Sequence, residues 1–336
     1  MIKNKPYLIA EVGQAHEGSI NMAHNFIREV KYGGASAVKF QCHFADHESS
    51  KFDKFRVKPQ FNCFKSRYDY WKKMEFSAEE WSGLFKHSKS LGLDFICSPF
   101  SEYSVDLISK TGVDIFKIAS GEILNVDLIK CIKKTKKKLI LSTGLTKLSE
   151  LKTILKYIER KKILSILYCV SKYPTPPIDI NLESMKLIKK YFKTETGISD
   201  HSGTIYPSLA AYLHGGNFFE VHVTFDKKIL NFDATSSINF FELKQLKEGL
   251  DFFNVMKTSK SSIRTLSSHQ LKYRKLFSRN AVVKKFLKKG SKIKEKDFVF
   301  LKPKIGIGND ELHKYIGKKT KKNLDTNHYL NIEDLQ

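Results

Sequence analysis

The stretch YLIAEVG (Tyr7–Gly13) sets the pattern that decides the fold: a short apolar run with a polar side chain, Glu11, near its end. Seven more such runs follow in the first two-thirds of the chain: AVKFQ (Ala37–Gln41), DFICSPF (Asp94–Phe100), DIFKIASGE (Asp114–Glu122), LILSTG (Leu139–Gly144), ILYCVSKYP (Ile166–Pro174), GISDH (Gly197–His201) and FFEVHV (Phe218–Val223). The segments between them are long enough for one helix each. The pattern therefore predicts a TIM (β/α)8 barrel with parallel strands.

Helix signals lie in several of the intervening segments. Ser77–Leu91 opens with SAEE, which is typical of a capping box between Ser77 and Glu80. Other helices are predicted over Ser19–Tyr32, Thr146–Arg160, Leu182–Tyr191, Tyr206–His214 and Phe240–Met256. The polar and aromatic stretch Phe44–Met74 breaks this rhythm, and we interpret it as a long functional loop after the second strand.

The character of the chain changes after the barrel. We predict a catalytic barrel over residues 1–257, a Ser- and Lys-rich linker over 258–275, and a separate β-rich domain over 276–336. The last segment has short strand-like runs, NAVV and FVFL, and no alternation of strands and helices. About 60 residues make a small core, so we expect this domain to dock onto a partner surface.

The formal net charge of +24 suggests nucleic-acid binding, but the lysines are spread over the whole chain. We expect no nucleic-acid partner, and instead a field that favours small anionic substrates. The N-terminus has no signal-peptide pattern, and no apolar run approaches the roughly 20 residues of a membrane helix. The five cysteines are scattered and odd in number, which is typical of a reduced, cytoplasmic protein. We expect no association with a membrane.

The strand ends carry the candidate active site, because strand C-termini converge at one rim of a barrel. The polar residues at these ends are Glu11, Lys39, Gln41, Ser98, Lys117, Ser120, Glu122, Ser142, Ser171, Ser199, His201 and His222. Two lysines among hydroxyl groups suit a phosphate or carboxylate. A Schiff-base lysine is the alternative, and it would need a depressed pKa in an apolar pocket.

The two histidines and two of the carboxylates have open interpretations. His201 and His222 suit a divalent metal that keeps positions for water or substrate, but each is equally compatible with an ordinary hydrogen-bonded histidine. Glu11 and Glu122 suit a general base, while a structural salt bridge with Lys39 or Lys117 is the alternative.

Eight motifs in order resemble the sialic acid synthase family, which includes the legionaminic and pseudaminic acid synthases. They are IAEVGQAHEGS (Ile9–Ser19), AVKFQ, SPF, FKIASGE, LSTG, CVSKYPTP (Cys169–Pro176), GISDHS (Gly197–Ser202) and the run Glu220–His222. SRN (Ser278–Asn280), KKGSKI and IGKKTKKNL resemble the C-terminal antifreeze-like (SAF) domain of that family.

The resemblance implies a TIM barrel followed by the SAF domain, in a domain-swapped homodimer. It implies condensation of phosphoenolpyruvate with an N-acylated amino sugar, assisted by Mn²⁺ or Mg²⁺ on His201 and His222. Glu11 would be the base for the attacking water. Phosphoenolpyruvate would be bound by Lys39, Ser98, Lys117, Ser120, Ser142, Ser171 and Ser199. The sugar would be contacted by Gln41, Tyr173, Asp233, Asn62, Tyr68 and, from the second subunit, Arg279.

Three departures from the family pattern bear on the sugar. Asn231-Phe232 replaces a usual Gly-Pro before Asp233, Ser171 stands where Asn is usual, and GIGND lacks the usual Pro. These leave the barrel chemistry intact, and the stretch Phe44–Met74 is the expected selector of the sugar. A Schiff-base pyruvate aldolase, or a non-catalytic basic protein that binds carbohydrate or nucleic acid, remain the alternative functions.

Overall fold

The computed structural model describes residues 5–55, 64–229, 231–260 and 264–336. The chain divides into two compact units, Met1–Thr258 and Ser259–Gln336. Among the described residues, no helix is long and apolar enough to cross a membrane.

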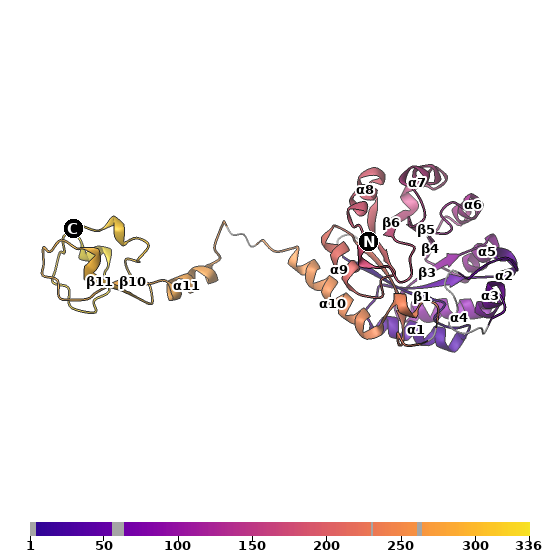
Figure 1. Ribbon diagram of the computed structural model, residues 1–336, viewed down its shortest axis with the longest axis horizontal. Helices are drawn as coiled ribbons and strands as arrows, with labels where there is room; N and C mark the ends of the chain where they lie inside the picture. The colour runs from indigo at the N-terminus through magenta and orange to yellow at the C-terminus, as the bar shows by residue number, and fades with distance from the viewer. Residues whose placement is uncertain (1–4, 56–63, 230, 261–263) are drawn as a thin grey trace. The chain divides into compact units, whose positions relative to one another are not determined.

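The first unit is a closed barrel of parallel strands (Figure 1). Each strand pairs with the next along the chain, and β1 also pairs with β8, which closes the ring. The strands are β1 (Tyr7–Gly13), β2 (Ala37–Cys42), β3 (Asp94–Pro99), β4 (Ile115–Ile118), β5 (Lys138–Ser142), β6 (Ile163–Cys169), β7 (Glu195–Asp200) and β8 (Phe218–Thr224). The predicted TIM barrel is therefore confirmed, and a short extra strand, β9 (Ser237–Asn239), pairs with β8.

Helices surround the barrel on its outside (Figure 1). They are α1 (Ile20–Tyr32), α4 (Ala78–Ser90), α5 (Glu102–Thr111), α6 (Val126–Lys134), α7 (Leu148–Ile154), α8 (Glu183–Phe192), α9 (Tyr206–Leu213) and α10 (Phe240–Met256). The capping box at Ser77 is confirmed, with Glu80 bonded back to the Ser77 amide. The α-helix predicted to reach Arg160 already ends at Ile154, because the chain tightens into a 3₁₀ turn over Leu155–Tyr157.

Two cores hold the barrel in shape. Apolar side chains between the strands and helices form the larger one, which includes Phe26, Phe40, Phe95 and Trp81. A smaller cluster fills the barrel interior, mostly with residues from the N-terminal parts of the strands: Tyr7, Ile9, Ala37, Ile96, Ile115, Ile140, Leu167 and Phe218. Because apolar side chains occupy that end, polar inward-facing residues are confined to the opposite, C-terminal rim.

The stretch after β2 is not the plain loop that the sequence predicts. It contains α2 (Ala45–Glu48) and α3 (Arg67–Met74). Tyr70, Trp71 and Met74 of α3 are buried in a cluster with Ala45, against which Phe232 packs. Tyr70 and Trp71, two of the aromatic residues of this stretch, thus belong to the buried face of α3.

The second unit has its own core, built from residues such as Ala281, Ile293, Phe298 and Leu330. Its strands β10 (Asn280–Val283) and β11 (Phe298–Leu301) pair antiparallel. The predicted linker overlaps α11 (Ser268–Phe277), a helix that belongs to the second unit. Its side chains are not buried, so the polar composition that suggested a linker reflects an exposed helix.

Candidate active site

Strand register brings the predicted strand-end residues together. Glu11 on β1 lies opposite Lys39 on β2 and opposite His222 on β8. Gln41 pairs with Ser98, and Ser199 pairs with Glu220. The expected convergence of these side chains at one rim follows directly from this in-register pairing of neighbouring parallel strands.

A buried ion pair joins the first two strands. The Lys39 ammonium group donates to Glu11 Oε2, and Gln41 Nε2 donates to Glu11 Oε1 at 2.6 Å. Gln14 in turn donates to Gln41 Oε1. Glu11 is fully buried and Lys39 is 3% exposed, so the carboxylate that we expected to act as a base is held by two donors.

Glu220 on β8 completes the network and is a residue that the sequence analysis did not assign. Its Oε1 accepts from Lys117 Nζ at 3.2 Å and from Ser199 Oγ at 2.9 Å, and Lys39 Nζ lies 3.5 Å away. Its Oε2 is buried and has no hydrogen-bond partner among the described residues. The sequence contained a sign that Glu220 belongs to the site. Glu220 stands two residues before His222, and residues two apart in a strand lie on the same face.

The two lysines differ in their electrostatic surroundings. Burial acts to lower the pKa of Lys39, but the carboxylates of Glu11 and Glu220 outweigh it and raise that pKa. Burial lowers the pKa of Lys117, Glu220 offsets part of this effect, and the field of Lys39 lowers the pKa further. Burial raises the pKa of Glu220, but Lys117 and Lys39 reverse this and hold it well below its usual range.

Hydroxyl groups surround this charge network. The side-chain oxygens of Ser98 and Ser142 are buried without a hydrogen-bond partner in the described part of the chain. Ser120 and Ser171 lie 3.0 Å apart, oxygen to oxygen. Buried hydroxyl groups normally find partners, so those of Ser98 and Ser142 are candidates to bind a ligand with polar oxygen atoms.

His201 and His222 also meet at this rim, with ring centroids 5.4 Å apart. His201 Nδ1 donates to the Val170 carbonyl at 2.9 Å, so its Nε2, 3.2 Å from the Tyr173 hydroxyl, carries the lone pair. Burial and then His222 lower the pKa of His201 to about 3, which keeps this ring neutral. His222 Nδ1 makes no hydrogen bond to a described residue, and Asp233 Oδ2 lies 3.6 Å from it.

The donor set therefore fits a metal in part. Two buried imidazoles, one of them oriented by a backbone carbonyl, are typical of a metal site with open positions. Among the described residues there is no group of three or more His, Cys, Asp or Glu side chains that could hold an ion. The described residues thus offer a metal ion two ring nitrogens, from His201 and His222. Oxygen atoms of water or substrate would take its other coordination positions.

Gly13 at the end of β1 leaves the space that His222 and Asp233 occupy. Its φ is +55°, and an added Cβ would lie 2.9 Å from Asp233 Oδ2 and 3.3 Å from His222 Nδ1. Both the left-handed conformation and the close approach require glycine here.

We expect Gly13→Ala to displace His222 and Asp233 and to lower turnover by at least about tenfold, with an added strain of about 1 kcal/mol from the positive φ. Steady-state kinetics and thermal unfolding measure the two effects. Gly290→Ala is the matched control, because Gly290 has φ +83° but nothing within 4 Å of its added Cβ. If both variants lose the same activity, the contact with His222 is not the cause.

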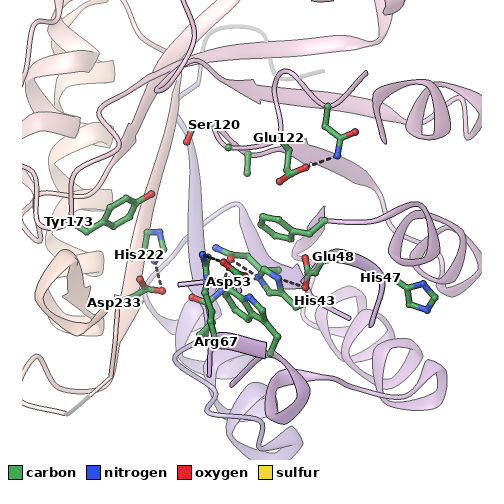
Figure 2. A pocket seen from close by; sticks show the side chains of 17 residues that line it. His43, His47, Glu48, Asp53, Arg67, Ser120, Glu122, Tyr173, His222 and Asp233 are labelled. Carbon is green, nitrogen blue, oxygen red and sulfur yellow. Dashed lines mark hydrogen bonds and ion pairs between the residues drawn. The ribbon is translucent and has the colours of Figure 1, made fainter. Parts of the chain in front are cut away.

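A cavity of about 530 Å³ opens at this rim (Figure 2). Six residues predicted from the sequence line it: Gln41, Ser120, Glu122, Tyr173, His222 and Asp233. The segment after β2 adds His43, His47, Glu48, Asp53, Arg67 and Trp71. His43 and His47 fall in the long loop that the sequence suggests as a pocket wall, and the signal for all six was the break in the strand–helix rhythm.

Glu122 lies in the loop after β4, where it accepts a hydrogen bond from Asn125 Nδ2 at 2.9 Å. No ion pair joins it to Lys39 or Lys117 in the described structure, since those lysines contact Glu11 and Glu220 instead. Burial raises the pKa of Glu122 despite the Asn125 contact, and Glu48 adds to the increase. Its place is on the outer wall of the cavity, away from the lysines.

The remaining three residues predicted to contact the sugar are Tyr68, Arg279 and Asn62. Tyr68 on α3 donates to Asp46 of α2 and does not line the cavity. Arg279 belongs to the second unit, where its guanidinium donates to the Phe300 carbonyl at 3.1 Å. Asn62 lies outside the described residues.

Comparisons with known proteins bear on the whole chain. The N,N'-diacetyllegionaminic acid synthase of Campylobacter jejuni is 32% identical over 326 residues, which cover 95% of this chain and 97% of that protein. The pseudaminic acid synthase of Helicobacter pylori is 29% identical and covers 98% of each chain. A crystal structure of N-acetylneuraminic acid (sialic acid) synthetase from Leptospira borgpetersenii, in complex with citrate, has a TM-score of 0.69 and 29% identity. That match covers 81% of this chain and 92% of the other.

The model of the NeuB family matches residues 26–262, which include seven of the eight barrel strands. The relatives extend the likeness over nearly the full length of the chain. Together with the closed barrel and its rim of lysine, glutamate and histidine side chains, these matches establish that this chain belongs to the NeuB family.

Proposed function

We propose that this chain condenses phosphoenolpyruvate with an N-acylated amino sugar to give a nine-carbon 2-keto acid and phosphate. The observation that carries the proposal is the buried network of Glu11, Lys39, Lys117 and Glu220 beside His201 and His222. It is supported by the names of the relatives, which are synthases of legionaminic, pseudaminic and N-acetylneuraminic acids.

Lys39 and Lys117 would bind the anionic groups of phosphoenolpyruvate. The buried hydroxyl groups of Ser98 and Ser142, which have no partner among the described residues, would donate to its oxygen atoms, with Ser120, Ser171 and Ser199 nearby. Glu220 holds both ammonium groups in place before the substrate arrives. A site arranged in advance loses little free energy to reorganisation when charge develops in the reaction.

The carbon–carbon bond would form between C3 of phosphoenolpyruvate and the aldehyde carbon of the open-chain sugar. Positive charge then develops at C2, and water adds there while Glu11 takes its proton. Collapse of the resulting tetrahedral carbon breaks the bond to the phosphate oxygen and releases phosphate. Gln41, Tyr173 and Asp233 would orient the sugar; Asn62 and Tyr68 stay sequence-based predictions of further contacts.

We place a divalent metal, Mn²⁺ or Mg²⁺, on His201 and His222. When bound, it would polarise the sugar aldehyde as a Lewis acid. The Val170 carbonyl orients the His201 ring, and the Tyr173 hydroxyl, 3.2 Å from Nε2, would release this nitrogen when the ion binds. Glu122, at the outer wall, would serve as a second acid or base for the sugar hydroxyl groups.

The test is a panel of acceptor sugars incubated with purified full-length protein, phosphoenolpyruvate and Mn²⁺. N-acetylmannosamine and a 2,4-diacetamido-trideoxyhexose are the two acceptors to begin with, and released phosphate is the readout. We expect sugar-dependent phosphate release with at least one of them. No release with any acceptor, at protein concentrations that bind phosphoenolpyruvate, would contradict the proposal.

One observation favours a second candidate, a Schiff-base pyruvate aldolase. The pKa of Lys117 is lowered by burial and by Lys39, as an amine nucleophile requires. Its contact with Glu220 and the second lysine favour an anion site instead. Borohydride trapping of pyruvate on Lys117, with no effect of a chelator on activity, would favour the aldolase.

We further propose that the second unit is an SAF domain, that two chains form a domain-swapped homodimer, and that Arg279 of one chain contacts the sugar bound by the other. Arg279 is exposed and uses one guanidinium nitrogen on Phe300, which leaves other donors for a ligand. We also propose a cytoplasmic reaction, because Cys42, Cys97, Cys131 and Cys169 are buried free thiols, as a reducing compartment allows.

A further inference from the structure

The outer part of the cavity is rich in negative charge. Among the described residues that line it, four are carboxylates: Glu48, Asp53, Glu122 and Asp233. Arg67 is the one lysine or arginine in that described lining. The carboxylates labelled in Figure 2 come from the segment after β2, the loop after β4 and the segment after β8, so they lie on different sides of the space.

The guanidinium of Arg67 is already engaged. Its Nη1 lies 3.2 Å from Asp53 Oδ1 and donates to the Lys54 carbonyl at 3.3 Å. The group also lies over the Trp71 ring, 5.0 Å from its centroid. A phosphate bound by the remaining nitrogens of this guanidinium would lie beside the Asp53 charge.

The carboxylates also act on one another across the cavity. Glu48 adds to the burial effect that raises the pKa of Glu122. Glu48 itself accepts from His43 Nδ1 at 2.9 Å and from the Phe44 amide at 3.0 Å, which fixes its oxygens in place. A dianion that entered this region would meet like charges, while hydroxyl and amide groups would find acceptors.

An apolar wall lies next to these carboxylates. The His43 ring is stacked between Trp71, at a centroid distance of 3.8 Å, and Phe100, at 4.1 Å. Flat rings of this kind suit the methyl groups of N-acyl substituents or of a deoxy sugar, and they offer nothing to a phosphate.

We infer, on the basis of the proposed function, that the acceptor is an uncharged amino sugar and that the Asp53–Arg67 ion pair excludes its phosphorylated form. Asp53 neutralises Arg67 and adds its own repulsion toward a sugar phosphate. This is discrimination by repulsion, in which an interface uses like charge to reject a wrong partner at a cost of several kcal/mol.

The experiment compares N-acetylmannosamine, its 6-phosphate and a 2,4-diacetamido-trideoxyhexose as acceptors for the full-length protein, with phosphate release at saturating phosphoenolpyruvate as the readout. We expect kcat/KM for the 6-phosphate to be at least about 100-fold below that of the better uncharged sugar, from the cost of like-charge contact. In Asp53→Asn this ratio should fall about tenfold, because one nearby charge is removed and Arg67 is released.

Asp251→Asn is the matched control, since Asp251 forms an exposed ion pair with Lys247 on α10, outside the cavity lining. Equal or better use of the 6-phosphate by the wild type would overturn the inference and leave the proposed function standing. An unchanged ratio in Asp53→Asn would overturn the role of the ion pair. If none of the tested acceptors supports turnover, both the inference and the proposed function are overturned.

Discussion

Replacement of Lys117 by methionine is expected to lower kcat/KM for phosphoenolpyruvate by about 10³-fold, as the loss of one preorganised electrostatic contact does in other active sites. Lys117 is 2% exposed, and its ammonium group is held by Glu220 at the base of the hydroxyl-lined site. Methionine keeps the length of the side chain and removes the charge, so the change isolates the electrostatic contribution. Initial rates over a range of phosphoenolpyruvate concentrations measure the loss.

We expect Lys117→Met to lose activity while its free energy of unfolding changes little. A buried ion that loses its only partner costs about 3–5 kcal/mol, but Glu220 keeps contacts with Lys39 and Ser199. Lys130→Met on α6 is the matched control, because Lys130 is an exposed lysine with a local partner, Asp127. Retained activity in Lys117→Met, with unchanged KM, would remove Lys117 from the phosphate site.

The lowered pKa of Lys117 also gives a direction for the pH dependence. The protonated amine binds phosphate, and burial together with Lys39 lets this proton leave at a lower pH than that of an ordinary lysine. Affinity for phosphoenolpyruvate should therefore fall as the pH rises through the lowered value, and Lys117→Met should abolish this fall.

Replacement of His222 by alanine is expected to reduce turnover by about 10³-fold, the scale of a lost Lewis-acid contribution of several kcal/mol, and to remove Mn²⁺ binding. The two imidazoles lie 5.4 Å apart at the rim, and His201 alone would leave one nitrogen ligand. Direct titration with Mn²⁺, followed by the spectrum of the free ion, reports on binding without reference to activity.

The fold of this variant should persist, because His222 Nδ1 makes no hydrogen bond to the described residues and its removal breaks none there. Circular dichroism and thermal unfolding test this point. His214→Ala at the end of α9 is the control, since His214 is a partly exposed histidine paired with Glu183 outside the cavity. Full activity and unchanged Mn²⁺ affinity in His222→Ala would contradict the metal assignment.

Positions with strong local signals were predicted well. β1 has the predicted bounds, and α4 starts at the predicted capping box, because apolar runs and capping chemistry are local properties of the chain. The helices α5 and α6 were missed, although Ser101 and Asn125 cap them in the structure. The segments of α5 and α6 follow polar strand ends. Because helix caps and site residues use the same residue types there, the start of each helix could not be told from the site.

Sequence alone determined the barrel and most residues of its rim, because the period of a strand dictates which side chains face inward and parallel strands end at one edge. Only the tertiary structure decided the partners of those residues: that Glu220 joins two lysines, that Gly13 makes room for His222, and that Asp53 neutralises Arg67. Such pairings depend on distances between segments that are far apart in the chain, and no local pattern of residues encodes those distances.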